Sequence, residues 1–204
     1  YFSAKNISTN IDGAMLWTVL HQHAQLLDPK ILTIAFVFLL VGYGTKIGLV
    51  PLHFWLPDAH SESPAPMSAL LSGLLLNIGV YALIRFKILV DPVITNQLAG
   101  HLMMAFGLLS FLVAGFFIYR QWNIKRMFSY SSIEHMGLII FAFGLGSFGS
   151  TFVGLFYIIL HSLVKSAVFM SVGNVIQFTK SQDMNKIRGL IIMNPRIGWT
   201  LLIG

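Results

Sequence analysis

Cysteine is absent from this chain of 204 residues, and charge is scarce. Without cysteine the chain cannot form a disulfide, ligate an iron–sulfur cluster through thiolates or use a thiol nucleophile. Only 10% of the residues are charged and 56% are hydrophobic, whereas a soluble domain carries about 25% charged residues. The mean hydropathy is +0.77. These side chains cannot cover a water-facing surface, which excludes an ordinary soluble domain.

The chain consists instead of a series of apolar runs, several of them about 20 residues long, which is the length that crosses a hydrocarbon core of about 30 Å. The sequence therefore predicts an all-α, polytopic transmembrane helix bundle. Residues 1–29 are too polar to span and are expected to form an interfacial amphipathic stretch and a loop. The expected spans are 30–52, 67–86, 98–119, 127–145 and 151–178, followed over 179–204 by a basic loop and the start of a sixth, truncated helix.

The formal net charge is +6, which by itself also fits a nucleic-acid-binding protein. However, the Lys and Arg residues lie in short loops between apolar runs, where they set the orientation of a membrane protein. The loops after the first, third and fifth spans carry most of them, so the positive-inside bias predicts that these loops face the cytoplasm. We expect a multi-pass protein of the cell inner (plasma) membrane, in contact with the lipid bilayer and not with nucleic acid.

Three ionisable side chains lie deep within the expected spans: Lys46 in the first, Glu134 in the fourth and Lys165 in the fifth. A charge at the centre of a bilayer costs about 2.5–3.5 kcal/mol on insertion scales. Such residues face a protein interior or a hydrated path, where they commonly carry protons or ions. The alternative is structural, because a buried lysine or Glu134 can also serve only as half of an ion pair that holds helices together.

Histidines accompany these charges. His161 and Lys165 are spaced i, i+4, which puts them on one helix face about a turn apart. His135 directly follows Glu134, and His53 comes two turns after the lysine of the first span, near the same face if that helix continues. Histidine titrates near neutral pH, and burial lowers the pKa of a lysine. The pattern predicts a proton relay in which lysines hold protons, histidines pass them and Glu134 tunes or receives them.

The stretch "GTKIGLVPLHFWLP", residues 44–57, places Lys46 among glycines and close to Pro51. Proline has no backbone N–H, so a carbonyl in the preceding turn loses its helical partner. In a membrane such an interruption persists only against protein or water, and transporters place ion sites at interrupted helices. Lys46 is therefore expected at a hydrated, switchable site. The alternative is that Pro51 only marks the end of the helix.

These motifs carry a family resemblance. "GTKIGLVPLHFWLPDAHSESPAPMSALLSGLLLNIGVYALIRF" resembles the lysine-bearing broken helix, loop and next helix of antiporter-like subunits. "NIKRMFSYSSIEHMGLIIFAFG" and "FYIILHSLVKSAVFMSVGNVI" resemble two helices from the second half of the same fold. Such subunits occur in respiratory complex I, in Mrp-type cation/proton antiporters and in membrane-bound hydrogenases. The "SSIEHMG" form, with "LHQHAQLLDPK" upstream, looks most like hydrogenase-four component F and related formate hydrogenlyase-type subunits.

The resemblance implies the central fragment of a subunit of roughly fourteen helices, with inverted repeats and broken helices. The chain also begins without Met and ends as a new apolar run starts, as expected for a piece of a longer protein. By likeness, Lys46 matches the central lysine of the first half-channel, and Lys165 matches the lysine that links the two halves. The family's glutamate partner of Lys46 would lie before Tyr1, and the terminal charged residue of the second broken helix would lie beyond Gly204.

Four positions depart from the family pattern. Ser72 and Asn77 stand where some complex I subunits have a histidine or a lysine. Tyr157 stands where some have a second histidine, and Glu134 where complex I subunits usually have an uncharged residue. The complex I relay across the second span therefore does not transfer directly to this chain.

The sequence thus predicts a proton-translocating membrane subunit of a hydrogenase-type or complex-I-like (NADH:quinone oxidoreductase-related) complex, without a redox centre, cofactor or metal of its own. Its expected partners are other membrane subunits and a peripheral redox arm with iron–sulfur and, in a hydrogenase, nickel–iron centres. One alternative is an Mrp-type secondary cation/proton antiporter subunit, driven by an ion gradient. Another is a haem-binding cytochrome with His135 and His161 as ligands, although no cytochrome motif supports it.

Overall fold

The computed structural model describes residues 16–94 and 97–187, together with 195, 198 and 199. In this part of the chain the elements are helical, and five stretches are long and apolar enough to cross a membrane. These stretches are Pro29–Ile47, Ala65–Val90, Leu98–Ile118, Ile124–Leu145 and Phe148–Thr179. The predicted all-α transmembrane bundle is confirmed. The stretches expected over 1–29 and 179–204 fall partly outside the described residues.

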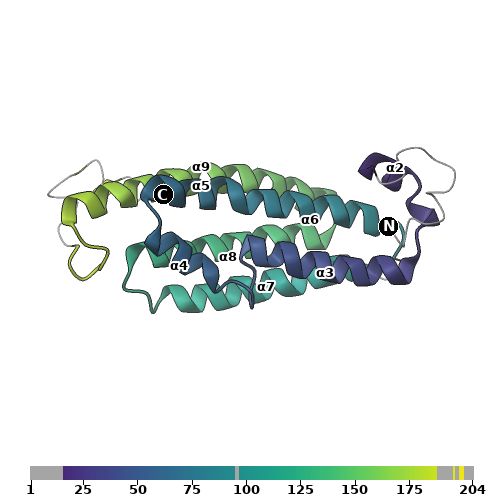
Figure 1. The fold of residues 1–204 in the computed structure, drawn as a ribbon, viewed down its shortest axis with the longest axis horizontal. Coiled ribbons are helices and arrows are strands. Elements are labelled where there is room, and N and C mark those ends of the chain that lie inside the picture. Colours follow the sequence, from purple (N-terminus) through teal and green to yellow (C-terminus); the bar gives the residue numbers. More distant parts are fainter. Residues whose placement is uncertain (1–15, 95–96, 188–194, 196–197, 200–204) are drawn as a thin grey trace.

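The described helices pack lengthwise into an elongated bundle (Figure 1). In it, α9 lies along α5 and α6, and the α7–α8 hairpin lies along α3 and α4. In chain order the elements are α2 (Trp17–Gln22), the 3₁₀ helix η2 (Ala24–Leu26), α3 (Pro29–Ile47), α4 (Trp55–Glu62), α5 (Ala65–Leu70), the π-helical η3 (Leu71–Leu75), α6 (Leu76–Val90), α7 (Leu98–Ile118), α8 (Ile124–Leu145) and α9 (Phe148–Thr179).

Local sequence signals set where the long helices begin. The Asp28 side chain accepts hydrogen bonds from the backbone N–H groups of the first turn of α3, and proline follows it at the first helical position. Asn123 caps α8 and Ser147 caps α9 in the same way. These side chains satisfy N–H groups that have no partner within the helix, and proline at the first position loses no hydrogen bond.

The first span is interrupted close to the predicted position. α3 ends at Ile47, before the expected boundary at 52, and Gly48 follows it in the left-handed conformation with φ of 83°. A Cβ at Gly48 would also lie 2.9 Å from the Leu56 side chain. After this break α4 forms within the stretch expected to be a loop. Glycine, rather than the later Pro51, therefore ends the helix, because only glycine adopts this backbone conformation without strain.

Glycines bring α7 and α8 into close contact. A Cβ at Gly107 would lie 2.7 Å from the Gly137 carbonyl oxygen, and a Cβ at Gly100 would lie 2.6 Å from that of Gly144. Helices in a membrane cannot gain from expelling water between apolar faces, so they associate where small residues let their backbones approach. This glycine contact makes the α7–α8 hairpin a rigid support for the residues of α8.

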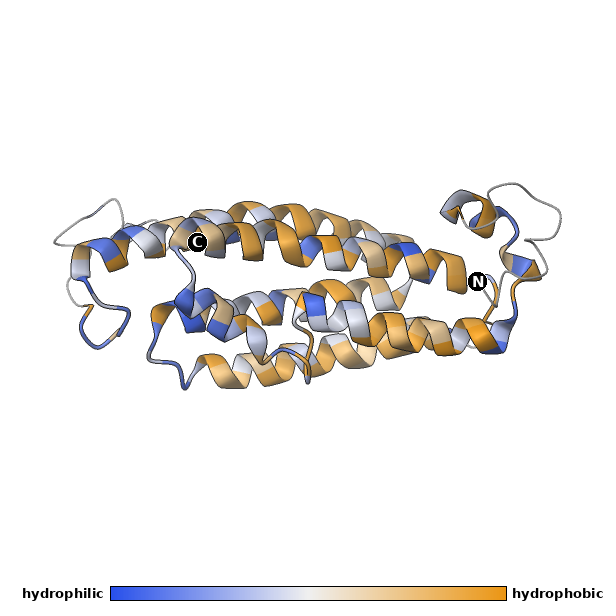
Figure 2. Cartoon of the chain, viewed as in Figure 1, coloured by the Kyte–Doolittle hydropathy of each residue, from blue (hydrophilic) through white to orange (hydrophobic). Residues whose placement is uncertain are grey.

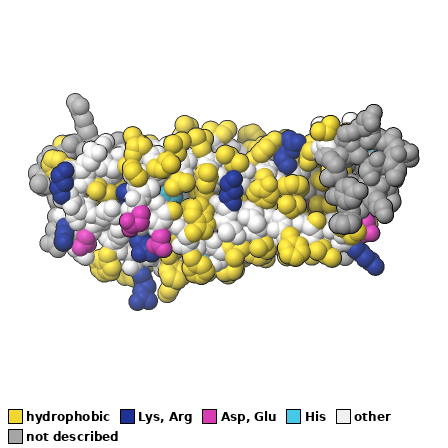
Figure 3. Space-filling model, viewed as in Figure 1, with side chains coloured by type: hydrophobic (Ala, Val, Ile, Leu, Met, Phe, Trp, Pro, Cys, Tyr) yellow, Lys and Arg dark blue, Asp and Glu magenta, His cyan; other side chains and the backbone are white. Residues whose placement is uncertain are grey.

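Apolar residues cover the middle of the bundle and polar residues gather at its ends (Figure 2). Charged side chains are concentrated toward the end that holds α4 (Figure 3). At the opposite end, α2 is attached to α6 by Trp17, whose indole N–H donates to the Arg85 carbonyl at 3.1 Å and whose ring lies 3.7 Å below the Arg85 guanidinium. A Trp–Arg contact at a helix end is typical of the membrane–water interface.

Candidate functional site

One face of α9 carries polar side chains at helical spacing. Tyr157, His161 and Lys165 follow one another at intervals of four residues, so they lie about one turn apart along the helix. His161 is 3% exposed and Lys165 is 4% exposed. The Lys165 Nζ donates a hydrogen bond of 2.6 Å to the Ser131 hydroxyl of α8. The structure therefore places the predicted His161–Lys165 pair inside the bundle.

α8 adds a histidine to this face. The Nδ1 of His135 shares a hydrogen bond of 2.5 Å with the Tyr157 hydroxyl, and the ring centroids of His135 and His161 are 5.6 Å apart. A groove of about 240 Å³ opens along these groups between α8 and α9. Its lining consists of His135, Tyr157, Leu160, His161, Val164 and Lys165. We refer to Tyr157, His135, His161, Lys165 and Ser131 as the α8–α9 polar line.

The chemistry of these side chains suits proton exchange. A hydroxyl or phenol both donates and accepts a hydrogen bond, and a neutral imidazole has one donor and one acceptor nitrogen. Each group of the α8–α9 polar line can therefore receive a proton on one side and release one on the other. Lysine adds a group that can store the proton as an ammonium.

Glu134 is half-buried and its carboxylate runs beside α7, where a Cβ at Gly115 would lie 3.8 Å from Oε1. Two ion pairs are present among the described residues, Lys87–Asp91 and Arg126–Asp58, and neither includes Glu134. The alternative that Glu134 only holds helices together through an ion pair with a lysine is therefore not supported by an ion pair among the described residues.

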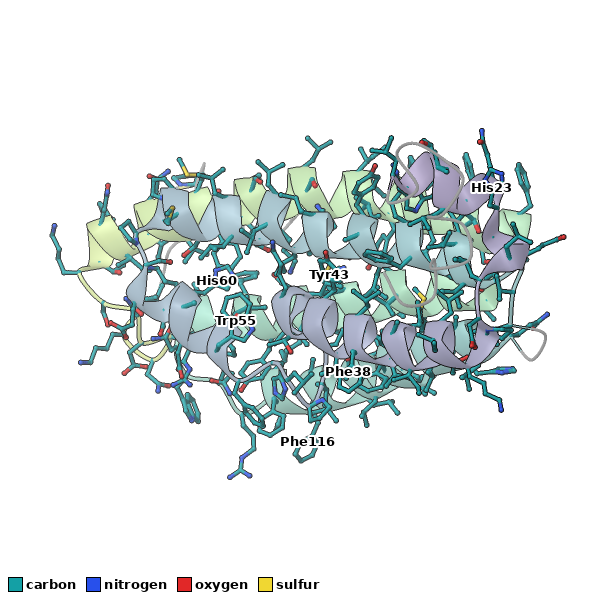
Figure 4. All side chains as sticks on the ribbon, turned by 45° about the vertical axis from the view of Figure 1, so that its right-hand side comes forward. His23, Phe38, Tyr43, Trp55, His60 and Phe116 are labelled. Carbon is teal, nitrogen blue, oxygen red and sulfur yellow. The ribbon has the colours of Figure 1, made fainter. Side chains whose placement is uncertain are left out.

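Lys46 lies in the last turn of α3, apart from the α8–α9 polar line. Its side chain is exposed on the described surface and lines a groove of about 220 Å³. The other lining residues are Phe38, Leu39, Gly42 and Tyr43, and Figure 4 shows Phe38 and Tyr43 along α3. The structure thus places Lys46 on the described surface and Lys165 inside the bundle.

The interruption beside Lys46 is stabilised by hydrogen bonds from neighbouring elements. The Val50 N–H donates to the Ser110 hydroxyl of α7 at 2.9 Å. The Trp55 indole N–H donates to the Thr45 carbonyl at 2.7 Å and connects α4 to α3 across the break. Backbone groups outside a regular helix therefore find protein partners, as an interrupted helix in a membrane requires.

His53 lies in the break between α3 and α4, against aromatic rings. It is 4% exposed, and its ring centroid is 4.7 Å from that of Phe54 and 6.1 Å from that of Tyr130. Burial lowers the pKa of His53, and a hydrogen bond to the Pro51 carbonyl opposes that effect. His53 is therefore a buried, mainly neutral ring beside the break.

In the second span, Ser72 and Asn77 make uncharged contacts in or next to the π-helical η3. The Ser72 hydroxyl is 2.8 Å from that of Ser132 on α8. The Asn77 amide donates to the Ser162 hydroxyl of α9 at 2.6 Å and to the Gly73 carbonyl at 2.8 Å. These two positions thus join the second span to α8 and α9 through hydrogen bonds rather than through a charge.

Two groups near the site were not among the predicted residues. Ser131 is the hydrogen-bond partner of Lys165, and nothing in the spacing of a lone serine distinguishes it from a packing residue. His60 of α4 is fully buried and stacks on Phe169 of α9 with 4.6 Å between ring centroids. One signal was available for His60: it lies four residues after Leu56, so the two share a buried face once the stretch is helical.

The sequence of this chain is similar to those of several known proteins. Residues 4–204 match the family described as NADH:quinone oxidoreductase/Mrp antiporter, TM. The "Hydrogenase-4 component F homolog" of Methylacidiphilum infernorum (isolate V4) is 48% identical over 204 residues, which is 100% of this chain and 43% of that protein. "NAD(P)H-quinone oxidoreductase chain 4" of Prochlorococcus marinus (strain AS9601) is 38% identical over 172 residues, which is 83% of this chain and 32% of that protein.

A solved structure, that of the membrane-bound sulfane sulfur reductase, an archaeal respiratory membrane complex, contains a similar chain. It superposes with a TM-score of 0.84 at 28% sequence identity, over 90% of this chain and 38% of that chain. The present chain therefore spans less than half the length of these relatives.

Fold and site together define a membrane-embedded helix bundle with an interrupted span and a buried line of titratable side chains. The chain belongs to the NADH:quinone oxidoreductase/Mrp antiporter transmembrane family. The resemblance drawn from the sequence motifs, including the likeness to hydrogenase-four component F, is confirmed.

Proposed function

We propose that this chain is the central part of a proton-translocating membrane subunit of a hydrogenase-type or complex-I-like oxidoreductase. The observation that carries the proposal is Lys165, which is 4% exposed and donates to a hydroxyl rather than to a carboxylate. Burial destabilises an ammonium, and a fixed counter-ion would stabilise it. Because the hydrogen-bond partner of Lys165 is neutral, its amine can gain and lose a proton as its surroundings change.

The α8–α9 polar line supplies the route for that proton. Lys165 Nζ exchanges it with His161 one turn away on α9, and His161 exchanges it with His135, whose ring is 5.6 Å distant between centroids. The Tyr157 phenol continues the line from His135 through their hydrogen bond. Glu134 lies next to His135 in the chain and tunes or receives the charge.

Lys46 is the second proposed proton carrier, and His53 connects it to the side of the membrane on which α4 lies. Lys46 occupies the end of an interrupted helix, the kind of place where transporters bind ions. Moving one charge against 100 mV costs about 2.3 kcal/mol. We propose that electron transfer in partner subunits supplies this energy. The proposed partners are other membrane subunits and a peripheral arm with iron–sulfur and, in a hydrogenase, nickel–iron centres. The complex would assemble at the cell inner membrane.

The test replaces Lys165 by alanine in the parent complex and compares proton uptake by inverted vesicles with electron transfer in the same preparation. We expect proton uptake per electron to fall at least about tenfold, since one positioned proton-transfer group contributes about 100-fold or more, while electron transfer continues or slows. Lys30→Ala, which removes an exposed lysine at the start of α3, is the control. Undiminished proton uptake in Lys165→Ala would show that the lysine is structural.

A second candidate is an Mrp-type cation/proton antiporter subunit, because the matched family includes Mrp antiporters. The two functions differ in what drives transport. A sodium or potassium gradient imposed across vesicles without an electron donor would move protons through an antiporter. The proposed oxidoreductase subunit would move them only while hydrogen, formate or NADH is oxidised.

A further inference from the structure

His60 has the features of a functional group rather than of a packing residue. It lies in α4, is fully buried, and neither ring nitrogen has a hydrogen-bond partner among the described residues. A buried polar atom without a partner is costly, so such atoms call for an explanation. Its ring is held parallel to that of Phe169, with 10° between the planes. Figure 4 shows His60 between α4 and the helices that cross above it.

Phe169 brings His60 of α4 against the face of α9 that carries the α8–α9 polar line. Phe169 follows Lys165 by four residues, which is one helical turn. The Lys165 Nζ lies 5.9 Å from the Phe128 ring centroid, and Phe128 and Phe169 are 6.5 Å apart between ring centroids. Lys165 therefore lies against Phe128 and His60 against Phe169, and these two rings contact each other. The charge of Lys165 acts on His60, so His60 continues the polar line beyond this aromatic pair.

Charged groups lie near His60 at this end of the bundle, some buried and some exposed. Lys125 is buried and its Nζ donates to the Ser63 carbonyl, one residue past the end of α4, at 2.7 Å. Asp58 of the same short helix forms an exposed ion pair with Arg126 at 2.7 Å. Burial first, and then the charges of Lys125 and Lys165, lower the pKa of His60 to about 4. The resting ring is therefore neutral, with one nitrogen able to accept a proton and the other able to donate one.

We infer that His60 is the group through which Lys165 exchanges protons with the aqueous side of the membrane on which α4 lies. The inference rests on the proposed proton-translocating function and adds a residue to it. A proton from that side binds the free ring nitrogen and gives a transient imidazolium. The imidazolium passes a proton through water to the neutral Lys165 amine, leaving a neutral ring and an ammonium. No other bond changes, and the reverse sequence returns the proton.

The decisive variant is His60→Phe in the parent complex, because phenylalanine keeps a ring that can stack on Phe169 and removes only the nitrogens. We expect the complex to assemble and to transfer electrons, with proton uptake per electron lowered at least about tenfold. His101→Phe makes the same change at an exposed position of α7 and is expected to leave proton uptake unchanged. Proton uptake by His60→Phe equal to that of the wild type would overturn the inference and leave His60 a packing residue.

Two further measurements keep the outcomes separable. If His60→Phe does not assemble, His60→Gln is used, since an amide can hydrogen-bond but does not exchange protons as imidazole does; normal proton uptake in that variant also overturns the inference. Lys165→Ala is measured in parallel. Loss of proton uptake in Lys165→Ala with full uptake in the His60 variants rejects the role of His60 alone, whereas full uptake in Lys165→Ala rejects the proposed function.

Discussion

The partners of Lys165 determine what that side chain can do. Its Nζ donates to the Ser131 hydroxyl, and the carboxylate of Glu134 turns toward α7 instead of closing an ion pair. A lysine locked to a carboxylate would keep its proton, because separating a buried pair costs several kcal/mol. A lysine bonded to a neutral hydroxyl does not carry that cost, so both protonation states remain accessible.

Tyr157 shows the same principle at a neighbouring position. A phenol stands where some family members are expected to have a histidine, and it bonds His135 at 2.5 Å. The hydrogen bond engages Nδ1 and orients the imidazole, which leaves Nε2 as the other ring nitrogen for proton exchange. Tyr157 is thus a positioning residue as well as a member of the α8–α9 polar line.

Tyr157→Phe is expected to slow proton uptake per electron several-fold while costing only about 1 kcal/mol of stability, the net worth of one hydrogen bond. The phenyl ring keeps the packing and removes only the hydroxyl that bonds His135. Tyr81→Phe is the matched control, since Tyr81 is exposed and its hydroxyl accepts a hydrogen bond from Arg85, toward the other end of the bundle. If both variants pump alike, the Tyr157 hydroxyl plays no part in the relay.

At the scale of elements, the break between α3 and α4 combines rigidity with access. α3 ends at a left-handed glycine, and the Trp55–Thr45 and Val50–Ser110 hydrogen bonds hold the interrupted segment to α3 and α7. The break is therefore an ordered structure and not a frayed helix end. It lets α4 turn inward and bury His60 beneath α9, which a continuous helix would not do.

The glycine contact between α7 and α8 is the element-level feature most sensitive to substitution. Gly107→Ala would place a Cβ 2.7 Å from the Gly137 carbonyl oxygen and from the Phe141 nitrogen. We expect the helices to separate and stability to fall by about 1–3 kcal/mol, the usual cost of overpacking. The thermal midpoint of the purified complex in detergent measures the effect.

Gly42→Ala is the control for that substitution, because a Cβ at Gly42 meets no atom within 4 Å. Alanine is favoured over glycine in a helix by about 1 kcal/mol, so the control should hold or raise the midpoint. An unchanged midpoint in Gly107→Ala would mean that α7 and α8 do not approach as closely as described.

At the scale of the whole molecule, the bundle has two unlike ends. The end with α4 and the C-terminal part of α9 gathers charged side chains (Figure 3), and the opposite end holds α2 and the start of α3 (Figure 1). The positive-inside bias predicts that the α4 end faces the cytoplasm. The direction in which His60 and Lys165 would take up protons follows from this orientation.

Because this stretch has no cysteine, orientation can be tested by single-cysteine labelling in a parent protein whose other cysteines have been replaced. A membrane-impermeant thiol reagent added to inverted vesicles should label Lys186→Cys and leave Lys30→Cys unlabelled, since these exposed positions lie at opposite ends. Intact cells should show the reverse. Labelling of Lys30→Cys in inverted vesicles would reverse the predicted topology.

The sequence by itself determined the class of fold and the family. Long apolar runs can be satisfied in a membrane only as helices, because every backbone polar group needs an internal partner there. The i, i+4 spacing of His161 and Lys165 determined that they share a face, since helix geometry is local. The interruption after Lys46 was also predictable, although the sequence interpretation stressed Pro51 and the structure assigns the end of α3 to Gly48.

Only the tertiary structure decided which helices bring their polar groups together. The Lys165–Ser131 and His135–Tyr157 hydrogen bonds join α8 to α9, and Glu134 lies beside α7 without forming an ion pair in the described part of the chain. His60 is buried because α4 packs under α9. These relations depend on the rotation of each helix about its axis and on contacts between residues far apart in the chain. Hydropathy and spacing describe one helix at a time, so neither contains this information.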